Sequence, residues 1–438
     1  GHDVVVTDDH IDDTKQDLAN ALGVELLHTP LDLRAFACQF HLIVPAPGVA
    51  ETHDLIAAAR SAGVPVVSEI ELAYRWEQER AQGPRPILAV TGTDGKTTTT
   101  DMTVAMLRAA GVRAEAVGNT DVPFLDAIET DLDVFVVECS SFRLAWTEQF
   151  RAEAAVWLNF APDHLNWHAS LASYEATKAR VFDLQRPTDV AIGSIEDTTV
   201  MKHLDEAPGR HRTFGLDRGD YRLEGRTLTG PDGPIVDASA MRRSLPHDIT
   251  NALAASALVL EPGRADAAAI RTALTAFVAQ PHRLEVLIRR DGITWYNDSK
   301  ATTPHAAATA IHAFDSVVLI AGGSRKGVDL SPMAAEANRI RTVVAIGEAA
   351  PDIRAVFGAS TPVTDAASMR DAVRVAAAAA VAGDAVVLSP GCASFDWYSG
   401  YPARGDDFRR LVHELYSDGT TNDASNDAAD PRDAEVRA

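Results

Sequence analysis

The chain is poor in cysteine and in positive charge and has no long apolar runs, and each absence excludes a class of protein. The cysteines, Cys38, Cys139 and Cys392, lie far apart and show no metal-ligand spacing. A disulfide framework is therefore not expected, and a reducing, cytoplasmic location is. The 40 Lys and Arg residues face 62 Asp and Glu residues, and the net charge of −22 argues against a nucleic-acid partner.

The apolar segments are too short for a membrane protein. The longest, such as residues 373–382, are alanine-rich and cannot cross a bilayer, so no membrane insertion is expected. No signal peptide is evident. The chain starts at Gly1 without a methionine, and no glycine-rich strand-turn unit precedes the first expected strand. We therefore expect an N-terminal unit to be missing, as judged against dinucleotide-binding folds.

What the sequence does contain is an alternation of short apolar runs with helix-like segments, which predicts the α/β fold class with parallel sheets. Strands are expected at 4–6, 41–44, 64–67, 87–90, 133–138, 156–159, 317–320, 343–346 and 385–388. Helices are expected at 18–22, 53–62, 70–79, 101–110, 174–184, 249–260, 265–277 and 369–382. An antiparallel hairpin is expected at 221–229.

Two junctions, at 82–86 and 280–283, divide this pattern into three domains. We expect a truncated Rossmann-like domain over 1–84, a central P-loop-type ATPase domain over 85–281 and a doubly wound Rossmann-like domain over 282–416. Residues 417–438 lack periodicity and are expected to form a disordered acidic tail.

The most informative segment is Thr-Gly-Thr-Asp-Gly-Lys-Thr-Thr at 91–98. Gly92 and Gly95 permit a tight turn that brings backbone N–H groups close to an anion. Lys96 supplies a positive charge, and Thr97 or Thr98 can offer a hydroxyl to Mg²⁺. A helix that follows would point its N-terminus at the same anion. The segment predicts a phosphate-binding loop without the strict motif's first glycine; the alternative is a glycine turn with a solvated lysine.

A carboxylate ends the apolar run at 133–138. In a parallel sheet, Glu138 would lie beside the phosphate loop, where it could bind Mg²⁺. The alternative is a strand-terminal glutamate that faces water.

Together with several other motifs, these segments resemble the ATP-dependent Mur ligases. The shared segments in the central expected domain and at the second junction are 91–98, 138–142, Asp163-His164, Tyr174-x-x-x-Lys178 and His282-Arg283. The segments 297–302, Gly322-Gly323-x-x-Lys326 and 389–396 look like the D-glutamate-adding branch of the family. The resemblance covers nearly the whole chain except its tail.

The resemblance implies an ADP-forming amide ligase of peptidoglycan precursor synthesis. ATP would phosphorylate the terminal carboxylate of UDP-N-acetylmuramoyl-L-alanine, and the amine of D-glutamate would then attack the acyl phosphate. The implied cofactors are ATP and Mg²⁺, and the implied partners are the two substrates. The first domain would bind the UDP-substrate and the third the amino acid and part of the nucleotide. A monomer is expected.

The resemblance also implies the roles of individual residues. Those with catalytic roles are Lys96, His164, Lys178 and Lys300. Those that bind the nucleotide are Gly92, Thr93, Asp94, Gly95, Lys96, Thr97, Thr98, Asn251, Arg283 and Asp298. Those that serve the metal are Thr97, Glu138, His164 and Lys178. Those that contact the UDP-substrate are Asp8, Asn119 and Ser140, and those that contact D-glutamate are Thr302, Lys326 and Ser394.

Lys178 is the unusual member of this set. Its counterpart in the family is carbamylated and so becomes an anion. From the residues alone, a surface lysine on a helix is the simpler interpretation.

Some positions depart from the family pattern. Asp248 stands where asparagine is usual, Arg143 replaces a common glutamine and Thr303 a frequent asparagine. Residues 166–168, 397–398 and 401 also vary. Two alternative functions stay open at this point: a non-catalytic or regulatory nucleotide-binding homologue, and a related amide ligase of different amino-acid specificity, such as a folylpolyglutamate synthase.

Overall fold

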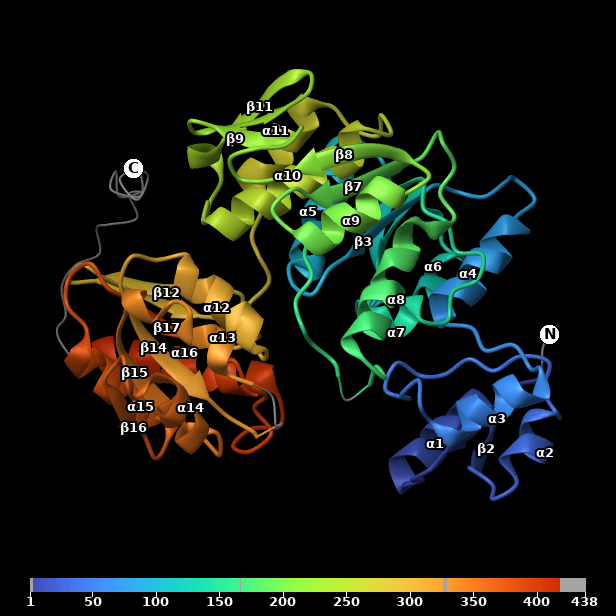
Figure 1. The fold of residues 1–438 in the computed structure, drawn as a ribbon, viewed down its shortest axis with the longest axis horizontal. Helices are drawn as coiled ribbons and strands as arrows, with labels where there is room; N and C mark the ends of the chain where they lie inside the picture. Colours follow the sequence, from blue (N-terminus) through green and yellow to red (C-terminus); the bar gives the residue numbers. More distant parts are fainter. Residues whose placement is uncertain (1–2, 166, 326–328, 418–438) are drawn as a thin grey trace. The chain divides into compact units, whose positions relative to one another are not determined.

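The computed structural model describes residues 3–165, 167–325 and 329–417 (Figure 1). The chain forms two compact units: residues up to 100 with 111–213 and 261–264, and residues 101–110 with 214–260 and those after 264. The three domain boundaries expected from the sequence stay a prediction. Lys326, Asn166 and residues 418–438 of the expected tail lie outside the described residues, whereas Ser417 is the last residue of a helix.

The first unit begins with a two-stranded parallel sheet and three helices. Their bounds are β1 Val5–Asp8, α1 Asp13–Leu22, β2 Glu25–His28, α2 Leu33–Ala37 and α3 Asp54–Ala62. An apolar cluster holds α2 and α3 together with Trp146 and Trp167 from later in the same unit.

The strands expected at 41–44 and 64–67 are wrong. They meet only at a single parallel bridge, Ile43 to Val66, in which Ile43 N donates to Pro65 O at 2.9 Å and Val67 N donates to Ile43 O at 3.0 Å. Pro45 and Pro65 lack the N–H groups that would extend the ladder on either side, so the pairing stops after one step.

A second, six-stranded sheet forms the core of this unit, in the order β4-β5-β3-β6-β7-β8. Its strands are β3 Ile87–Thr91, β4 Ala114–Gly118, β5 Val134–Glu138, β6 Ala154–Trp157, β7 Val190–Ser194 and β8 Arg210–Phe214. The helices between them, preceded by α4 Glu69–Gln78, are α5 Lys96–Ala109, α6 Phe124–Ala127, α7 Ser141–Leu144, α8 Leu171–Asp183 and α9 Thr198–Glu206.

The strand order creates a binding position. The pairs β4–β5, β5–β3, β3–β6 and β6–β7 are all parallel, so the carboxyl ends of these strands share one edge. The chain leaves β3 toward β4 and β5 on one side and later continues to β6 on the other. Such a reversal of strand order opens a crevice at the carboxyl end of the central strand, where ligands bind in open α/β sheets.

The second unit contains a small antiparallel sheet in the order β11-β10-β9 and two helices. The bounds are β9 Arg222–Glu224, β10 Thr227–Gly230, β11 Gly233–Asp237, η1 Ala238–Ala240, α10 Pro246–Leu260 and α11 Ala267–Ala276. The hairpin expected at 221–229 is confirmed.

The other sheet of this unit has six strands in the order β12-β13-β17-β14-β15-β16, parallel except for β12. The strands are β12 Glu285–Arg290, β13 Ile293–Asn297, β14 Val317–Gly322, β15 Ile340–Ile346, β16 Val363–Asp365 and β17 Ala385–Leu388. The helices are α12 Pro304–His312, α13 Ser331–Ala334, η2 Ala337–Arg339, α14 Ala350–Phe357, α15 Met369–Ala379 and α16 Tyr401–Ser417.

Two apolar cores cover the two faces of this sheet. One contains α12, α13 and α14, and the other contains α15 and α16, as Figure 1 shows in orange and red. Helices on both faces of a mostly parallel sheet are the doubly wound arrangement, and the α/β fold class is thereby confirmed. Among the described residues, no helix has both the length and the apolar character that a membrane span requires.

Candidate active site

The expected phosphate loop lies at the carboxyl end of β3 and leads directly into α5. Asn159, which follows β6, holds the loop: its Oδ1 accepts from the N–H groups of Thr93 and Asp94, each at 2.9 Å. At Gly92 a Cβ would lie 3.0 Å from Leu158 Cβ and 3.1 Å from Asp94 O. A side chain there would push the loop away from the strand end, so glycine is required for this close approach.

Two lysines converge on one backbone carbonyl of this loop. Lys96 Nζ donates to Gly92 O at 2.9 Å and to Thr93 O at 2.7 Å. Lys178 Nζ, from α8, donates to the same Gly92 O at 2.6 Å. Two ammonium groups this close repel each other strongly. The arrangement is stable with one amine neutral or with an anion beside them, as expected for a phosphate site.

Lys178 is the amine whose charged form is disfavoured. Its side chain is 1% exposed and packs over the Tyr174 ring at 4.7 Å. Burial, and then the charge of Lys96, hold the pKa of Lys178 well below its ordinary value. The interpretation of this residue as a surface lysine is therefore wrong. The lowered pKa favours the neutral amine, which is the nucleophilic form of a lysine side chain.

Glu138 lies on β5, next to the loop, because Val90 and Glu138 are paired in the parallel register. Its side chain is 1% exposed, which excludes the water-facing alternative. Oε1 accepts from Asn119 Nδ2 at 2.8 Å. Oε2 is buried and, among the residues that the structure describes, has no hydrogen-bond partner. An orphaned carboxylate oxygen beside a phosphate loop fits a hard cation.

His164 follows β6, with φ at 54° and its ring 4.7 Å from the Phe142 ring. Its Nε2 lies 3.2 Å from Asp163 Oδ2. Within the described ranges, no three His, Cys, Asp or Glu side chains gather into a metal site by themselves. Magnesium is often bound by one or two carboxylates plus substrate phosphates, so Glu138 and the Thr97 hydroxyl suit a site that the nucleotide completes.

A chain of buried and partly buried polar side chains supports the loops around this site. His168 Nε2 lies 2.9 Å from Ser141 Oγ, and its Nδ1 lies 3.5 Å from Glu51 Oε2. Glu51 Oε1 also accepts from Ala169 N at 2.7 Å and from Ser173 Oγ at 3.0 Å. Glu51 thereby ties the loop that precedes α3 to the start of α8, the helix of Lys178.

Two of the expected substrate contacts in this unit differ in their surroundings. Ser140 is buried, and its Oγ has no partner in the described part of the chain, which leaves it available to a ligand. Asp8 accepts from Lys15 Nζ at 2.9 Å and from His10 N at 2.8 Å, and these bonds lower its pKa. Asp8 is thus ionised but locally paired.

In the second unit, Asp298 follows β13 and is buried. Its Oδ2 accepts from Ser389 Oγ at 2.8 Å, and its Oδ1 accepts from Leu284 N at 3.1 Å. Burial raises the pKa of Asp298 to about 7, although these hydrogen bonds oppose the shift. Lys300 follows on the same segment, with its Nζ 5.0 Å from the centre of the Tyr401 ring.

The other expected residues of this unit lie on separate elements. Asn251 is buried in α10, and Ser394 is buried in the loop after β17. Thr302 follows Lys300, and its N–H donates to Lys300 O at 2.8 Å. Asp298, Lys300 and Thr302 thus share one segment after β13, and Asn251 and Ser394 lie on other elements.

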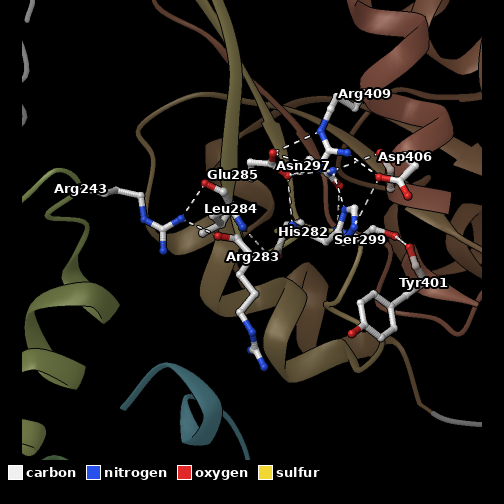
Figure 2. Close-up of polar contacts among 12 residues, drawn as sticks. Arg243, His282, Arg283, Leu284, Glu285, Asn297, Ser299, Tyr401, Asp406 and Arg409 are labelled. Atoms are coloured by element: carbon white, nitrogen blue, oxygen red, sulfur yellow. Dashed lines mark hydrogen bonds and ion pairs between the residues drawn. The ribbon is translucent and has the colours of Figure 1, made fainter. Parts of the chain in front are cut away.

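Arg283 lies between α11 and β12, where the helix α16 contributes to a polar network (Figure 2). Arg409 donates to both carboxylate oxygens of Glu285, at 3.0 and 2.7 Å. Asp406 lies 3.7 Å from His282 Nε2. A Cβ on Gly405 would lie 2.2 Å from His282 Nδ1, so only glycine fits where α16 meets this ring. Helix α16 thus contacts the side chains of His282 and Glu285, which lie on either side of Arg283 in the sequence.

Comparison with known proteins identifies the family. Residues 90–259 match the Mur ligase middle domain, and residues 282–392 match the Mur ligase, glutamate ligase domain. A UDP-N-acetylmuramoylalanine--D-glutamate ligase of Frankia casuarinae is 44% identical over 387 residues, covering 85% of this chain and 80% of the relative. The chain belongs to this ligase family. The enzyme of the same name from Streptomyces coelicolor is 39% identical and covers 85% of this chain and 84% of its own length.

Solved structures agree with the fold of this D-glutamate ligase family. The MurF ligase of Thermotoga maritima in complex with ADP matches with a TM-score of 0.62 at 16% identity, covering 89% of this chain and all of that one. Folylpolyglutamate synthase of Mycobacterium tuberculosis matches with a TM-score of 0.58 at 18% identity, covering 78% of this chain and 94% of that one. At these identities the likeness concerns the fold alone.

The structure also reveals a residue of this family member that the sequence reasoning missed. Arg404 on α16 is 1% exposed, and its guanidinium donates to Ser299 Oγ, Ser299 O, Cys392 O and Ala393 O at 2.8 to 3.1 Å. It thus joins the segment of Asp298 to the segment of Ser394. The sequence feature that could have pointed to Arg404 is the Arg-Gly pair at 404–405 in a polar segment, and such a pair is a weak indication of a buried arginine.

A pH prediction follows from Asp298. Its carboxyl holds its proton to about pH 7 in the folded state but only to about pH 4 when unfolded. The contribution of Asp298 to the free energy of unfolding is therefore fully present below pH 4 and is lost as the pH rises through 7. We expect Asp298→Asn to flatten the pH dependence of the unfolding free energy between pH 5 and 8 by about 2 to 3 kcal/mol. Urea denaturation at several pH values measures this, with the exposed Asp291→Asn as control; equal slopes in wild type and Asp298→Asn would contradict it.

Proposed function

We propose that this chain is an ATP- and Mg²⁺-dependent ligase that joins D-glutamate to UDP-N-acetylmuramoyl-L-alanine in the cytoplasm, through an acyl phosphate. One observation carries the proposal: two lysine amines meet at Gly92 O, at the end of β3 and next to the unpaired oxygen of Glu138. Membership of the D-glutamate ligase family supports the choice of substrates. We also propose that the chain acts as a monomer.

The phosphate loop positions the nucleotide and offsets negative charge. Transfer of a phosphoryl group to a carboxylate brings two anions together, so catalysis rests on positioning and charge neutralisation. Lys96 would exchange its bonds to the loop carbonyls for bonds to the β- and γ-phosphate oxygens. The first backbone N–H groups of α5 add donors and a favourable dipole.

Glu138 and Thr97 would hold the magnesium ion, with His164 serving a second metal position. When bound, Mg²⁺ offsets charge on the transferred group and holds its oxygens in place. Asn119 fixes one oxygen of Glu138 and leaves the other for the cation.

Lys178 would act as a carbamate. A neutral amine adds to CO₂ to give a carbamate and one released proton, and the lowered pKa of Lys178 favours this neutral form. The product is an anion beside Lys96, so carbamylation would place an attractive negative charge next to that ammonium group.

The remaining residues would bind the two substrates and the rest of the nucleotide. Asp8, Asn119 and the unpaired Ser140 hydroxyl would contact the UDP-substrate. Thr302, Lys326 and Ser394 would contact the carboxylates of D-glutamate, with Lys300 as the nearby cation, because a doubly negative amino acid needs cations and hydroxyls. Asn251, Arg283 and Asp298 would bind the nucleoside and phosphates.

A phosphate-release assay on this chain tests the proposal. UDP-N-acetylmuramoyl-L-alanine, ATP and Mg²⁺ are combined in turn with D-glutamate, L-glutamate, D-aspartate and meso-diaminopimelate. We expect release with D-glutamate and at least about tenfold less with each other amino acid. Release that prefers another amino acid would indicate a ligase of different specificity. ATP binding without release would indicate a non-catalytic homologue, and both results contradict the proposal.

A further inference from the structure

The segment that carries Arg283 has an unfavourable backbone conformation on both sides of this residue. The φ angle is 64° at His282 and 45° at Leu284, and neither is glycine. A Cβ makes the left-handed region unfavourable, so the conformation persists only where surrounding contacts determine it.

Contacts from the following sheet provide part of this support. His282 N donates to Glu285 Oε2 at 3.1 Å, and Lys300 N donates to His282 O at 3.1 Å. Leu284 N donates to Asp298 Oδ1 at 3.1 Å. The position of Asp298, a proposed nucleotide contact, is thus linked to the backbone next to Arg283.

Arg243, which precedes α10, provides the remaining support for the backbone around Arg283. Its Nη1 donates to Arg283 O at 2.5 Å and to Leu284 O at 2.7 Å, as Figure 2 shows. Its Nε and Nη2 donate to the two carboxylate oxygens of Asp248, at 2.7 and 2.6 Å. Asp248 is 2% exposed and also accepts from Leu245 N at 3.2 Å. One guanidinium therefore joins the start of α10 to two successive carbonyls of the junction.

The side chain of Arg283 itself takes no part in this network. In Figure 2 it extends away from the dashed contacts. Its Nε is buried and has no hydrogen-bond partner in residues 3–165, 167–325 and 329–417. The backbone of Arg283 is held while its guanidinium stays available for a ligand.

We propose that Arg243 and Asp248 are positioning residues for nucleotide binding, which act by fixing the backbone of Arg283 and Leu284. This inference rests on the proposed function, in which Arg283 and Asp298 bind the nucleotide. It also explains Asp248, which departs from the family's usual asparagine. A carboxylate accepts two N–H groups of Arg243 side by side, whereas an asparagine has one acceptor oxygen. The second oxygen fixes the orientation of the guanidinium and directs Nη1 to the carbonyls.

The test compares Arg243→Lys and Asp248→Asn with Arg242→Lys, a control at the exposed neighbouring arginine. Lysine keeps the charge of Arg243 but lacks the planar fork. In the nucleotide-free protein, we expect amide hydrogen exchange over residues 282–286 to become at least about tenfold faster in Arg243→Lys. Calorimetric titration should show an ADP–Mg²⁺ dissociation constant raised about tenfold. The KM for ATP should rise in parallel, with the KM for D-glutamate changed less than about twofold. Asp248→Asn should show smaller changes in the same direction.

The outcomes separate this inference from the proposed function. If Arg243→Lys lowers the melting temperature but leaves the ADP dissociation constant and the exchange at 282–286 unchanged, the pair has a structural role only and the inference is wrong. Equal rises in every KM would contradict it as well. If the wild-type chain does not bind ADP–Mg²⁺, the proposed function fails and this inference fails with it.

Discussion

Replacing Lys178 with alanine is expected to lower kcat by at least about a thousandfold while the protein stays folded. The loss of a preorganised charged group at the site of phosphoryl transfer costs about two to three orders of magnitude or more. Lys178 Nζ contacts Gly92 O at 2.6 Å, so its removal also releases the loop that carries Lys96. Phosphate release at saturating substrates measures the effect.

Partial rescue distinguishes an anionic role from a purely structural one. Alanine leaves room beside Gly92 that a small carboxylate can occupy. We expect added formate or acetate to restore a measurable part of the activity of Lys178→Ala, because either supplies the negative charge of a carbamate. Lys202→Ala, at an exposed lysine that pairs with Glu175, serves as control and should keep full activity without either anion. Full activity in Lys178→Ala would contradict the role.

Replacing Arg404 with methionine is expected to lower kcat/KM for D-glutamate by about a hundredfold or more. The carbonyls of Ser299, Cys392 and Ala393 would lose a charged donor, and each such loss costs about 1 kcal/mol or more. The summed loss is about 3 kcal/mol. If all of it raises the free energy of the transition state, kcat/KM falls more than a hundredfold. Burial lowers the pKa of Arg404 to about 10, so the residue is still charged at pH 7.

Two further variants distinguish a general loss of protein stability from a specific effect of Arg404 on D-glutamate binding. Arg410→Met, at an exposed arginine of the same helix, should change neither stability nor activity by much, because exposed ion pairs contribute little. Arg404→Lys keeps a charge in place and should retain more thermal stability than Arg404→Met. In Arg404→Lys we still expect a raised KM for D-glutamate, since one ammonium cannot reach all four acceptors. An unchanged KM in a folded Arg404 variant would show that the residue does not position the substrate segments.

The sequence predicted best those elements whose formation depends on residues close together in the chain. The apolar run, the glycine turn and the following helix around Lys96 depend on neighbouring residues, and the structure has them as β3, the loop and α5. The strands at 41–44 and 64–67 failed because apolar character alone does not supply a ladder of N–H groups where prolines interrupt it.

Burial of charged groups could not be predicted from local sequence. Lys178 reads as a surface residue until α8 is packed against the end of β3. Arg243 and Arg404 lie outside the motifs that suggest the site, and their partners include backbone carbonyls 40 and 105 positions away, at Arg283 and Ser299. Backbone carbonyls leave no mark in a sequence, so such contacts emerge only from the folded chain. Asp248, by contrast, was recognisable in the sequence because it departs from the family's usual asparagine, and the structure identifies Arg243 as its partner.

The position of α16 sets a limit on how the protein can be shortened or fused. Gly405, Asp406 and Arg409 all reach the junction around His282, and Arg404 reaches the segments after β13 and β17. The final described helix is therefore packed into the segments that carry the proposed site residues. A chain cut within the first three turns of α16 would lose contacts to His282, Glu285 and Ser299, which lie more than a hundred positions earlier.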